Sequence, residues 1–369
     1  MKIAYLGIKG LPSKWGADRV VEAIVQRLSN IHDITVYCSS REVQIGTTFS
    51  NIKLFRVPCL AGKYTHMISV NLFASLHAVI WGNFDLIHIH NIETAFVLPI
   101  LKLRYKVVST AHGRITVGNK WNSSAAKLMN LMELPFSKLS NKATSVALAD
   151  ANQISKTYNR EVIYIPNGID EQPIIDIQAA LDTKKSLDIV QNPFLMCAAG
   201  RIIPLKGFHL ILEAFKVIPK DYYMIVVGDL NQSPEYSKKL YSLADERVIF
   251  VPFISSLPHL LGLIQLSSLF IFPSMNEGMS MMLLEAASTG TPIVCSDILA
   301  NKTILPKQAL HFANGNVDDL KEKLIYAINH PQEMESLGRK AQEHIKSLYS
   351  WDKIAFQYNL VYEQVTGLV

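Results

Sequence analysis

Short apolar runs alternate with amphipathic stretches along the first half of the chain. Between the first two runs, residues 18–28 place Val20, Val21, Ile24, Val25 and Leu28 at helical spacing. The runs themselves have the length and apolar character of buried strands. They lie at residues 2–7, 33–38, 86–90, 106–110, 143–148 and 161–166. This regular alternation predicts a parallel sheet covered by helices on both faces.

A second series of the same kind follows the segment PNGID at residues 166–170. Residues 171–193 are polar or weakly patterned and predict a linker with a helix. Further apolar runs lie at residues 194–200, 222–228, 247–253, 268–274 and 291–297. We therefore expect an α/β protein with two doubly wound, Rossmann-like domains, residues 1–170 and residues 171–350. The helical pattern near the end of the chain, in residues 351–369, could pack on either domain.

One uncharged stretch is long enough to suggest a membrane span. Residues 65–84 contain no Asp, Glu, Lys or Arg. Polar side chains such as Asn71 and His77 interrupt this stretch, and it leads into the strand-like run at residues 86–90. We therefore predict a buried helix of the first domain and no membrane span. The chain begins with a short apolar strand instead of an export signal, so we expect a cytoplasmic protein.

Composition excludes several classes of protein. Apolar residues make up 49% of the chain and charged residues 18%, which excludes disorder and fibrous repeats. The net charge of +5 is too small to indicate a nucleic-acid partner. The four cysteines lie far apart with no CxxC pair, which argues against a zinc ribbon or a disulfide framework.

Positive charge is concentrated between residues 100 and 145. Apolar side chains such as Trp121 and Leu128 are interleaved with it, and Glu133 is the only acidic residue there. A basic, partly apolar surface could contact anionic lipid headgroups, which would make the protein peripheral on the inner face of the cell membrane. A solvated helix face explains the pattern equally well. The basic residues are Lys102, Arg104, Lys106, Arg114, Lys120, Lys127, Lys138 and Lys142.

The most informative segment is FPSMNEGMSMMLLEAASTGT, residues 272–291. A strand is expected to end at Pro273, and Ser280 is a suitable N-cap for a helix over residues 281–288 that Gly290 ends. The backbone N–H groups of Gly278, Met279 and Ser280, together with the positive end of the helix dipole, predict an anion site.

Two glutamates in this segment are eight positions apart. On one helix, Glu277 and Glu285 would be separated by roughly 12 Å of rise, so they could not share a proton or a metal ion. With Glu277 in the turn, they can instead bind the two ends of an elongated ligand that carries a phosphate between them. Hydroxyl groups are the natural partners of both carboxylates. A capping glutamate and an exposed helix glutamate would be the simpler interpretation of either residue alone.

A second segment, GRIIPLKG at residues 200–207, supplies two cations. Arg201 and Lys206 follow the apolar strand that ends near Gly200, and an amphipathic helix comes next. Two cations at the carboxyl end of a strand suit a diphosphate leaving group, because Arg offers a planar fork and Lys a point charge. Considered alone, the segment is equally consistent with two solvated surface charges.

The first domain has weaker candidates. The loop GIKGLPSKWG contains Gly7, Gly10 and Gly16, whose spacing is not G-x-G-x-x-G and so argues against a nicotinamide dinucleotide site. These glycines allow the backbone to approach a phosphate or a sugar closely, although the turn alone also explains them.

Three histidines follow or lie in predicted strands. His88 and His90 are on one face of a strand, where we expect partly buried and hydrogen-bonded side chains. There is no H-E-x-x-H motif and no third ligand at suitable spacing, so we predict no zinc site. His112 ends a strand beside Gly113 and Arg114, and we expect it to have a functional role.

Taken together, GRIIPLKG, PNGI, FPSMNEGMSMMLLEA and STAHG resemble the retaining glycosyltransferases of the GT-B, family 4 type, over nearly the whole chain. GIKGLPSKWG and AHGRITVGNKW are similar to a bacterial subgroup that includes rhamnosyltransferases of surface-polysaccharide synthesis. The resemblance implies a GT-B fold, in which two domains face each other across a cleft and residues 351–369 return to the first domain. It also implies transfer of a sugar from a nucleoside diphosphate sugar to a saccharide or lipid-linked saccharide, without a metal or other cofactor.

The resemblance assigns roles in the second domain. Arg201 and Lys206 would hold the donor diphosphate and stabilise it as it leaves. Glu285 would bind the ribose hydroxyls, and Glu277 would contact the hydroxyls of the donor sugar. The backbone of residues 278–280 would lie near the phosphates.

In the first domain, the resemblance places His112 beside the transferred sugar, and Gly10 and Gly16 beside the acceptor or the donor phosphate. Two other functions remain open. A sugar-nucleotide epimerase of the same fold would use general-base carboxylates, and a non-catalytic protein would only bind the nucleotide sugar.

Overall fold

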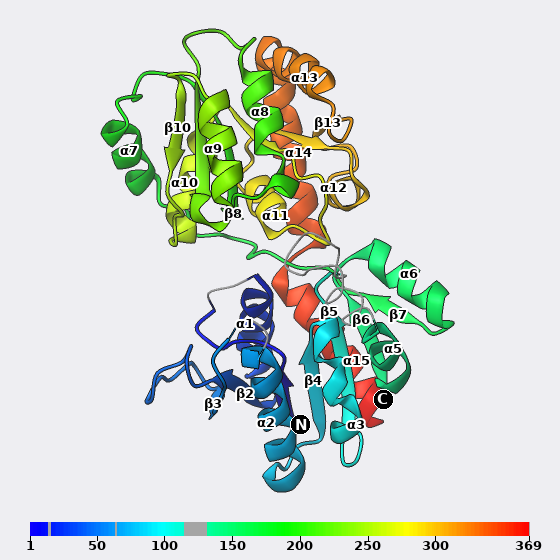
Figure 1. Ribbon diagram of the computed structural model, residues 1–369. Coiled ribbons are helices and arrows are strands. Elements are labelled where there is room, and N and C mark those ends of the chain that lie inside the picture. Colours follow the sequence, from blue (N-terminus) through cyan, green and yellow to red (C-terminus); the bar gives the residue numbers. More distant parts are fainter. Residues whose placement is uncertain (14–15, 63–64, 114–130, 369) are drawn as a thin grey trace. The chain divides into compact units, whose positions relative to one another are not determined.

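The computed structural model describes residues 1–13, 16–62, 65–113 and 131–368, which form two compact units (Figure 1). The N-terminal unit consists of residues 1–168 and 351–369, and the C-terminal unit consists of residues 169–350. Each unit is built on its own parallel sheet with helices on both faces. The predicted α/β fold with two Rossmann-like domains is therefore confirmed.

The sheet of the N-terminal unit has the order β3-β2-β1-β4-β5-β6-β7 in the described residues, and every pairing in it is parallel. The strand β3 was not predicted, because it lies at the edge of the sheet and contains a lysine and an arginine. The strands are β1 (Lys2–Leu6), β2 (Asp33–Ser39), β3 (Lys53–Val57), β4 (Leu86–His90), β5 (Lys106–Ala111), β6 (Lys142–Ser145) and β7 (Val162–Tyr164).

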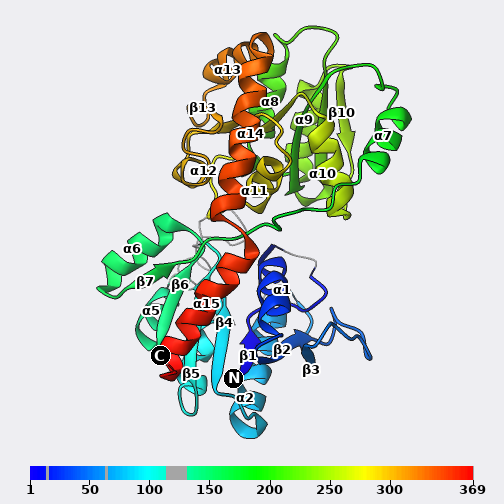
Figure 2. The ribbon, with the colours of Figure 1, turned by 180° about the vertical axis from the view of Figure 1, so that it is seen from behind.

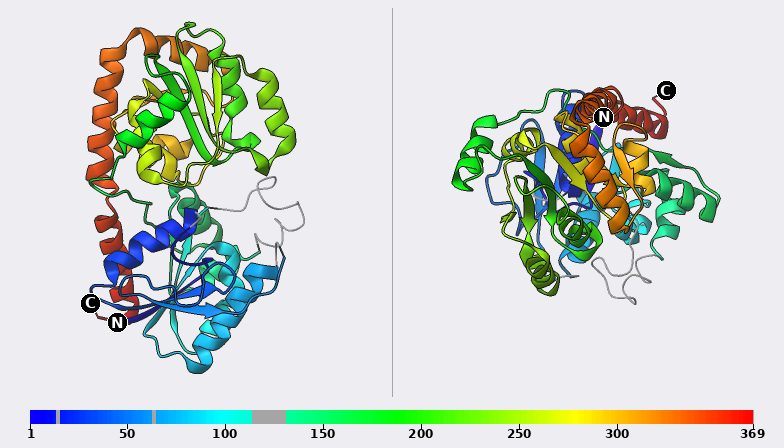
Figure 3. Two further views of the ribbon diagram at one scale, coloured as in Figure 1. Left: turned by 90° about the vertical axis from the view of Figure 1, so that its left-hand side faces the viewer. Right: turned by 90° about the horizontal axis from the view of Figure 1, so that it is seen from above.

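Helices cover both faces of this sheet. The helices α1 and α15 pack against each other on one face, and α2, α3 and α5 lie on the other face with the short helix η1. Figures 2 and 3 show α15 and α2 on opposite sides of the unit. The helices are α1 (Gly16–Leu28), α2 (Thr65–Trp81), η1 (Ile92–Val97), α3 (Leu98–Leu101), α5 (Glu133–Leu139), α6 (Leu148–Tyr158) and α15 (Trp351–Thr366).

The uncharged stretch near residue 65 forms the helix α2, but the expectation that this helix is buried is only half right. Val70, Ala74 and Ala78 lie in the core. The opposite face is apolar as well and is exposed to solvent, because apolar side chains occur all round the helix. Its large exposed side chains are Ile68, Phe73, Leu76, Ile80 and Trp81. Among the described residues, no helix has both the length and the apolar character needed to cross a membrane.

The sheet of the C-terminal unit has the order β10-β9-β8-β11-β12-β13 in the described residues and is also parallel. Neighbouring residues along β8 enter different cores, Met196 on one face and Cys197 on the other, so the sheet is buried on both sides. The strands are β8 (Phe194–Arg201), β9 (Tyr223–Asp229), β10 (Val248–Val251), β11 (Leu269–Phe272), β12 (Ile293–Ser296) and β13 (Leu310–Phe312).

The helices of this unit follow its strands in the pattern of repeated βα units. The predicted linker after residue 170 contains the helix α7. The helices are α7 (Ile177–Ser186), η2 (Pro204–Lys206), α8 (Phe208–Phe215), η3 (Leu230–Gln232), α9 (Pro234–Leu243), α10 (Leu257–Leu266), α11 (Met281–Ser288), α12 (Leu299–Ile304), α13 (Val317–Asn329) and α14 (Pro331–Leu348).

A buried polar network fixes the last helix, α15, to the sheet of the N-terminal unit. The hydroxyl of Tyr362 is 2.8 Å from Nδ1 of His88 and 2.9 Å from the hydroxyl of Tyr5. Nε2 of His88 is 2.6 Å from Oγ1 of Thr110 on β5. All four side chains are buried, so each needs these partners in place of water.

This network predicts the effect of removing one hydroxyl. The variant Tyr362→Phe removes the partner of Nδ1 of His88 and of the Tyr5 hydroxyl, and we expect it to lower the free energy of unfolding by about 1–3 kcal/mol. The control variant, Tyr326→Phe, removes a hydroxyl that bonds to Glu333 at an exposed position and should change stability by less than about 0.5 kcal/mol. Equal losses in denaturant unfolding of the two variants would contradict this account of α15.

Candidate functional site

Two loops of the C-terminal unit leave neighbouring strands at the same edge of the sheet. The loop after β8 leads through η2 to α8, and the loop after β11 leads to α11. Strands β8 and β11 are adjacent, and the chain continues from them in opposite directions, to β9 on one side and to β12 on the other. This reversal is the topological switch point at which open α/β sheets bind ligands.

A glycine holds the two loops together. Gly207 has φ of +72°, and a Cβ atom at this position would collide with the carbonyl oxygen of Pro273 at the end of β11. Next to this contact, the backbone N–H of Met275 donates to the carbonyl of Leu205 at 2.8 Å. The side chains beside this contact on the two loops are therefore placed within reach of each other.

The first result of this placement is an ion pair that sequence analysis did not predict. Nζ of Lys206 lies 2.5 Å from Oε1 of Glu277, and the hydroxyl of Ser274 donates to the same carboxylate oxygen. The side chains of Lys206 and Glu277 are 24% and 12% exposed. The two residues are 71 positions apart, so no local pattern in the sequence could have paired them.

The second cation of this region, Arg201, ends strand β8. A bulge between Ala198 and Arg201 shifts the register with β9, so that the backbone of Arg201 lies opposite that of Asp229 in the sheet. Its side chain is half-buried and makes no hydrogen bond or ion pair within the described part of the chain. The guanidinium is thus available to a ligand, and Gly200 beside it is exposed.

The helix α11 begins where the sequence predicted. Ser280 has extended backbone angles and accepts a hydrogen bond from the N–H of Leu283 at 3.3 Å, which confirms it as the N-cap. This cap leaves the N–H groups of Met281 and Met282 without a partner inside the helix. Gly278 and Met279 are partly exposed just before it. The arrangement can bind an anion at the helix N-terminus.

Glu285 lies one turn further along α11 and is almost fully buried, with 3% exposure. Gly290, with φ of +80°, follows the helix. The predicted roles of Glu285 and Glu277 toward two ends of a ligand remain predictions. What the structure adds is that the two carboxylates differ in environment, since Glu277 is paired with a lysine.

Side chains from β12, α12 and the loop after β13 support the loop after β11. The hydroxyl of Ser296 donates to the carbonyl of Ser274, and Nδ2 of Asn301 donates to the carbonyl and hydroxyl oxygens of Ser296, both at 3.0 Å. Nδ2 of Asn314 donates to the carbonyl of Met275 at 3.2 Å. The backbone on which Glu277 stands is therefore held by buried and partly buried polar contacts.

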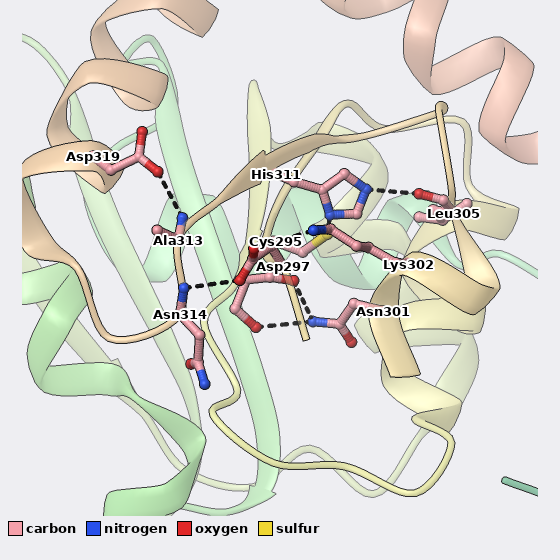
Figure 4. Close-up of polar contacts among 10 residues, drawn as sticks. Cys295, Asp297, Asn301, Lys302, Leu305, His311, Ala313, Asn314 and Asp319 are labelled. Carbon is pink, nitrogen blue, oxygen red and sulfur yellow. Dashed lines mark hydrogen bonds and ion pairs between the residues drawn. The ribbon is translucent and has the colours of Figure 1, made fainter. Parts of the chain in front are cut away.

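Asp297 organises this support, as Figure 4 shows. Its carboxylate accepts from the backbone N–H of Asn314 at 3.0 Å and pairs with Lys302 at 3.1 Å. The hydrogen bond from Asn314, followed by the contact with Lys302, lowers the pKa of Asp297, so this carboxylate stays charged at neutral pH.

The candidates of the N-terminal unit lie in the loops after β1 and β5. Gly10 has φ of +155°, and a Cβ atom there would collide with the side chain of Val43. Gly16 begins α1 with open space around it. The close contact within the turn therefore explains why position 10 is a glycine, whereas the open space at Gly16 leaves room for a ligand. Arg114, and the neighbouring positions of the basic region up to residue 130, lie outside the described residues.

The three histidines form one group, and the prediction of partly buried side chains for two of them is wrong. His88 and His90 are fully buried on β4, because α15 covers this part of the sheet. Nδ1 of His90 lies 2.9 Å from Nε2 of His112, whose ring stacks on it. Desolvation lowers the pKa of His112 to about 4, so the imidazole is neutral at physiological pH.

Within the described residues, no group of three or more His, Cys, Asp and Glu side chains is arranged to hold a metal ion. The cysteines Cys38, Cys59, Cys197 and Cys295 are free.

Two protein-family models match most of the chain between them. The model described as "Glycosyltransferase Family 4" matches residues 16–172, and the model described as "Glycosyl transferases group 1" matches residues 181–344.

Curated relatives include a UDP-Gal:alpha-D-GlcNAc-diphosphoundecaprenol alpha-1,3-galactosyltransferase of Escherichia coli. It is 25% identical over an alignment of 329 residues, and the match covers 84% of this chain and 82% of the relative. The O-antigen biosynthesis glycosyltransferase WclY of Escherichia coli is 21% identical, and the match covers 99% of this chain and 99% of the relative.

Solved structures share the fold. HepE from Anabaena, in complex with UDP and glucose, has a TM-score of 0.80 at 16% identity and covers 99% of this chain and 100% of its own. The sucrose-phosphate synthase of Thermosynechococcus elongatus has a TM-score of 0.81 at 16% identity and covers 100% of both chains.

The contact between the two loops predicts an asymmetry between two glycines. Gly207→Ala adds a Cβ atom against the Pro273 carbonyl at a positive φ, and we expect it to lower the free energy of unfolding of the C-terminal unit by about 3 kcal/mol or more. Gly315 has φ of +77°, but a Cβ atom there would meet only the terminal methyl of Met275 at 4.0 Å, so Gly315→Ala should cost only about 1 kcal/mol. Denaturant unfolding of both variants measures the difference, and similar losses would show that the loops are not held by this contact.

Proposed function

Since the chain belongs to the family 4 glycosyltransferases with the GT-B fold, we propose that it transfers a sugar from a nucleoside diphosphate sugar to a hydroxyl group of a saccharide acceptor. Its relatives include enzymes of bacterial polysaccharide synthesis. The acceptor in our proposal is a growing surface saccharide, either free or linked to a lipid diphosphate.

The observation that supports this function best is the convergence of Arg201, Lys206 and the N-terminus of α11 at the switch point of the sheet. Transfer of a glycosyl group leaves negative charge on the departing diphosphate and positive charge on the anomeric carbon. Fixed positive groups aimed at the diphosphate stabilise the transition state more than the ground state. Arg201 can bind two phosphate oxygens at once, and Lys206 can follow the charge as it develops.

In this proposal the ion pair has a part in binding the donor. Glu277 holds the ammonium of Lys206 at the mouth of the sheet, and Ser274 fixes the carboxylate through the same oxygen. The other carboxylate oxygen can then accept from a hydroxyl of the donor sugar. Glu285 binds the ribose hydroxyls, and Gly200, Gly278 and the residues up to Ser280 present backbone to the phosphates.

We propose further that the configuration at the anomeric carbon is retained and that no metal ion is required. The acceptor hydroxyl attacks the anomeric carbon on the face from which the diphosphate leaves. As the bond between the anomeric carbon and the phosphate oxygen breaks, this oxygen accepts the proton of the hydroxyl. This route needs positive charge at the phosphate, which Arg201, Lys206 and the helix N-terminus provide. Activity that survives EDTA treatment would support the metal-free mechanism, and activity that returns only with added divalent ions would contradict it.

Our choice of donor sugar rests on similarity to other enzymes and not on the geometry of the site. The N-terminal stretch is similar to rhamnosyltransferases, so a nucleoside diphosphate rhamnose is our first choice of donor. The galactosyltransferase named above uses UDP-galactose, and HepE binds UDP and glucose. A panel that varies both the base and the sugar is therefore the appropriate screen, with nucleoside diphosphate release as the signal.

We also propose that the N-terminal unit contacts an anionic membrane surface. The exposed apolar face of α2 ends at Trp81, and Nη1 of Arg104 donates to the carbonyl of Val79 on the same helix. Leu103 beside it is 79% exposed, and Lys102 flanks it. Apolar and cationic side chains in this combination suit the interface of anionic lipids.

A vesicle experiment tests this contact. We expect the protein to co-sediment with vesicles that contain anionic lipid and to be released by salt. Trp81→Glu should weaken this binding severalfold, because it places a charge in the apolar face. Equal binding to zwitterionic vesicles, or no loss in the variant, would contradict the proposed surface.

Substitution of the two cations tests the function itself. We expect Arg201→Ala and Lys206→Ala each to lower kcat by roughly 10²–10³, the loss typical of one transition-state donor, while the fold is kept. The control Arg339→Ala removes an exposed arginine of α14 and should leave kcat unchanged.

The products distinguish this function from its rivals. Release of nucleoside diphosphate with formation of a glycoside supports a transferase. An epimerised nucleotide sugar without an acceptor product would indicate an epimerase, and tight binding without turnover would indicate a binding protein. Near-normal rates in both alanine variants would show that the phosphate site is assigned wrongly.

A further inference from the structure

The pair formed by His90 and His112 has a property that the proposed function does not use. Their rings are joined by one hydrogen bond, from Nδ1 of His90 to Nε2 of His112, at 2.9 Å. One of these two nitrogens must therefore carry the proton and the other must accept it. The choice fixes the protonation of both remaining ring nitrogens, since each neutral imidazole has a single N–H.

The surroundings of the two remaining nitrogens are different. Nε2 of His90 is fully buried and has no hydrogen-bond partner in the described part of the chain. His112 is only partly buried, and its Nδ1 makes no hydrogen bond with the described residues. Nε2 of His90 is thus enclosed in the protein, whereas His112 is partly exposed and its Nδ1 is not among the enclosed, unpartnered atoms of the described residues.

The two possible protonation states of the pair differ in whether the enclosed Nε2 of His90 carries a proton. If His112 donates from Nε2, then His90 must carry its proton on the enclosed Nε2, and a buried N–H is left without an acceptor. If His90 donates from Nδ1, the enclosed atom is a bare acceptor. Orphaned buried N–H groups are the rarer defect in folded proteins, so the second state is favoured.

We propose that His90 is a positioning residue that fixes His112 in the tautomer with its proton on Nδ1. Nδ1 of His112 is then a hydrogen-bond donor, suited to an oxygen of the substrate such as a sugar hydroxyl or a phosphate oxygen. It has no lone pair there with which to take a proton from an acceptor hydroxyl. The identity of the substrate in this inference rests on the proposed function. The tautomer of His112 does not.

Packing holds the donor ring of His90 in place. The ring of Tyr5 stacks on it with centroids 5.9 Å apart and planes within 15°. The ring of His88 lies 4.1 Å away on the same strand, and hydrogen bonds at both of its nitrogens fix its own orientation. Desolvation lowers the pKa of all three histidines, which keeps the pair neutral and preserves a single shared proton.

The tautomer bears on the mechanism. A neutral histidine that only donates cannot be the general base of the reaction, so the acceptor proton must leave by another route. Transfer to the departing phosphate oxygen, as proposed above, is such a route. His112 then contributes by holding an oxygen of the substrate.

Nitrogen-15 NMR of the ring nitrogens tests the tautomer without any substrate. Protonated and bare imidazole nitrogens have widely separated shifts, and the spectrum of His112→Gln identifies the signals of His112. We expect Nδ1 of His112 to be protonated and Nε2 to be bare in the intact protein. The reverse assignment would overturn the proposal, whatever the activity of the enzyme.

Two nearly isosteric variants of His90 test its positioning role. The amide of Asn can take the place of Nδ1–H and donate to His112, whereas Leu cannot. We expect His90→Leu to lower kcat/KM roughly tenfold, the loss of about one hydrogen bond, and to give a mixture of His112 tautomers. His90→Asn should stay within about threefold of the parent and keep the Nδ1–H signal.

Equal losses in the two variants would mean that His90 acts through packing alone and would overturn its positioning role. If His90→Leu does not fold, the spectra of the parent and of His90→Asn still decide the tautomer. Failure of the proposed function would give a different result. No nucleotide sugar would then be turned over, while the NMR result would stand.

Discussion

The close contact of Gly207 with the Pro273 carbonyl is the constraint on which the proposed donor site depends. The loops after β8 and β11 lie so close together here that a side chain at position 207 would not fit between their backbones. This contact brings the loop that carries Lys206 against the loop that carries Glu277. The parallel order of β8 and β11 places Arg201 and the N-terminus of α11 at the same edge of the sheet. Polar contacts from Ser296 and Asn314 hold the second loop in this position.

Charge in this region is arranged in two different ways. Lys206 is paired with a carboxylate that has low exposure, while the guanidinium of Arg201 has no partner among the described residues. An incoming diphosphate would meet one cation that is already oriented and another that is available. In the histidine group of the N-terminal unit, by contrast, the buried side chains are neutral and are joined by hydrogen bonds. Each unit thus offers a different kind of polar group.

Much of this fold could be predicted from the sequence, because buried parallel strands and capped helices have local signatures. The N-cap Ser280 and the helix after it were located correctly. The edge strands β3 and β13 were missed, since they are short or contain charged residues. The Lys206–Glu277 pair depends on which strands are neighbours, and no spacing along the chain encodes this. The exposed face of α2 escaped prediction because its apolar residues surround the helix.

The position of a bound nucleoside diphosphate in a crystal structure of this chain would decide whether the donor site is placed correctly. We expect the terminal phosphate to accept hydrogen bonds from Arg201 and Lys206 and to lie against the backbone of residues 278–280. A diphosphate bound elsewhere on the protein, or bound at this edge of the sheet with both cations turned away from it, would contradict the account.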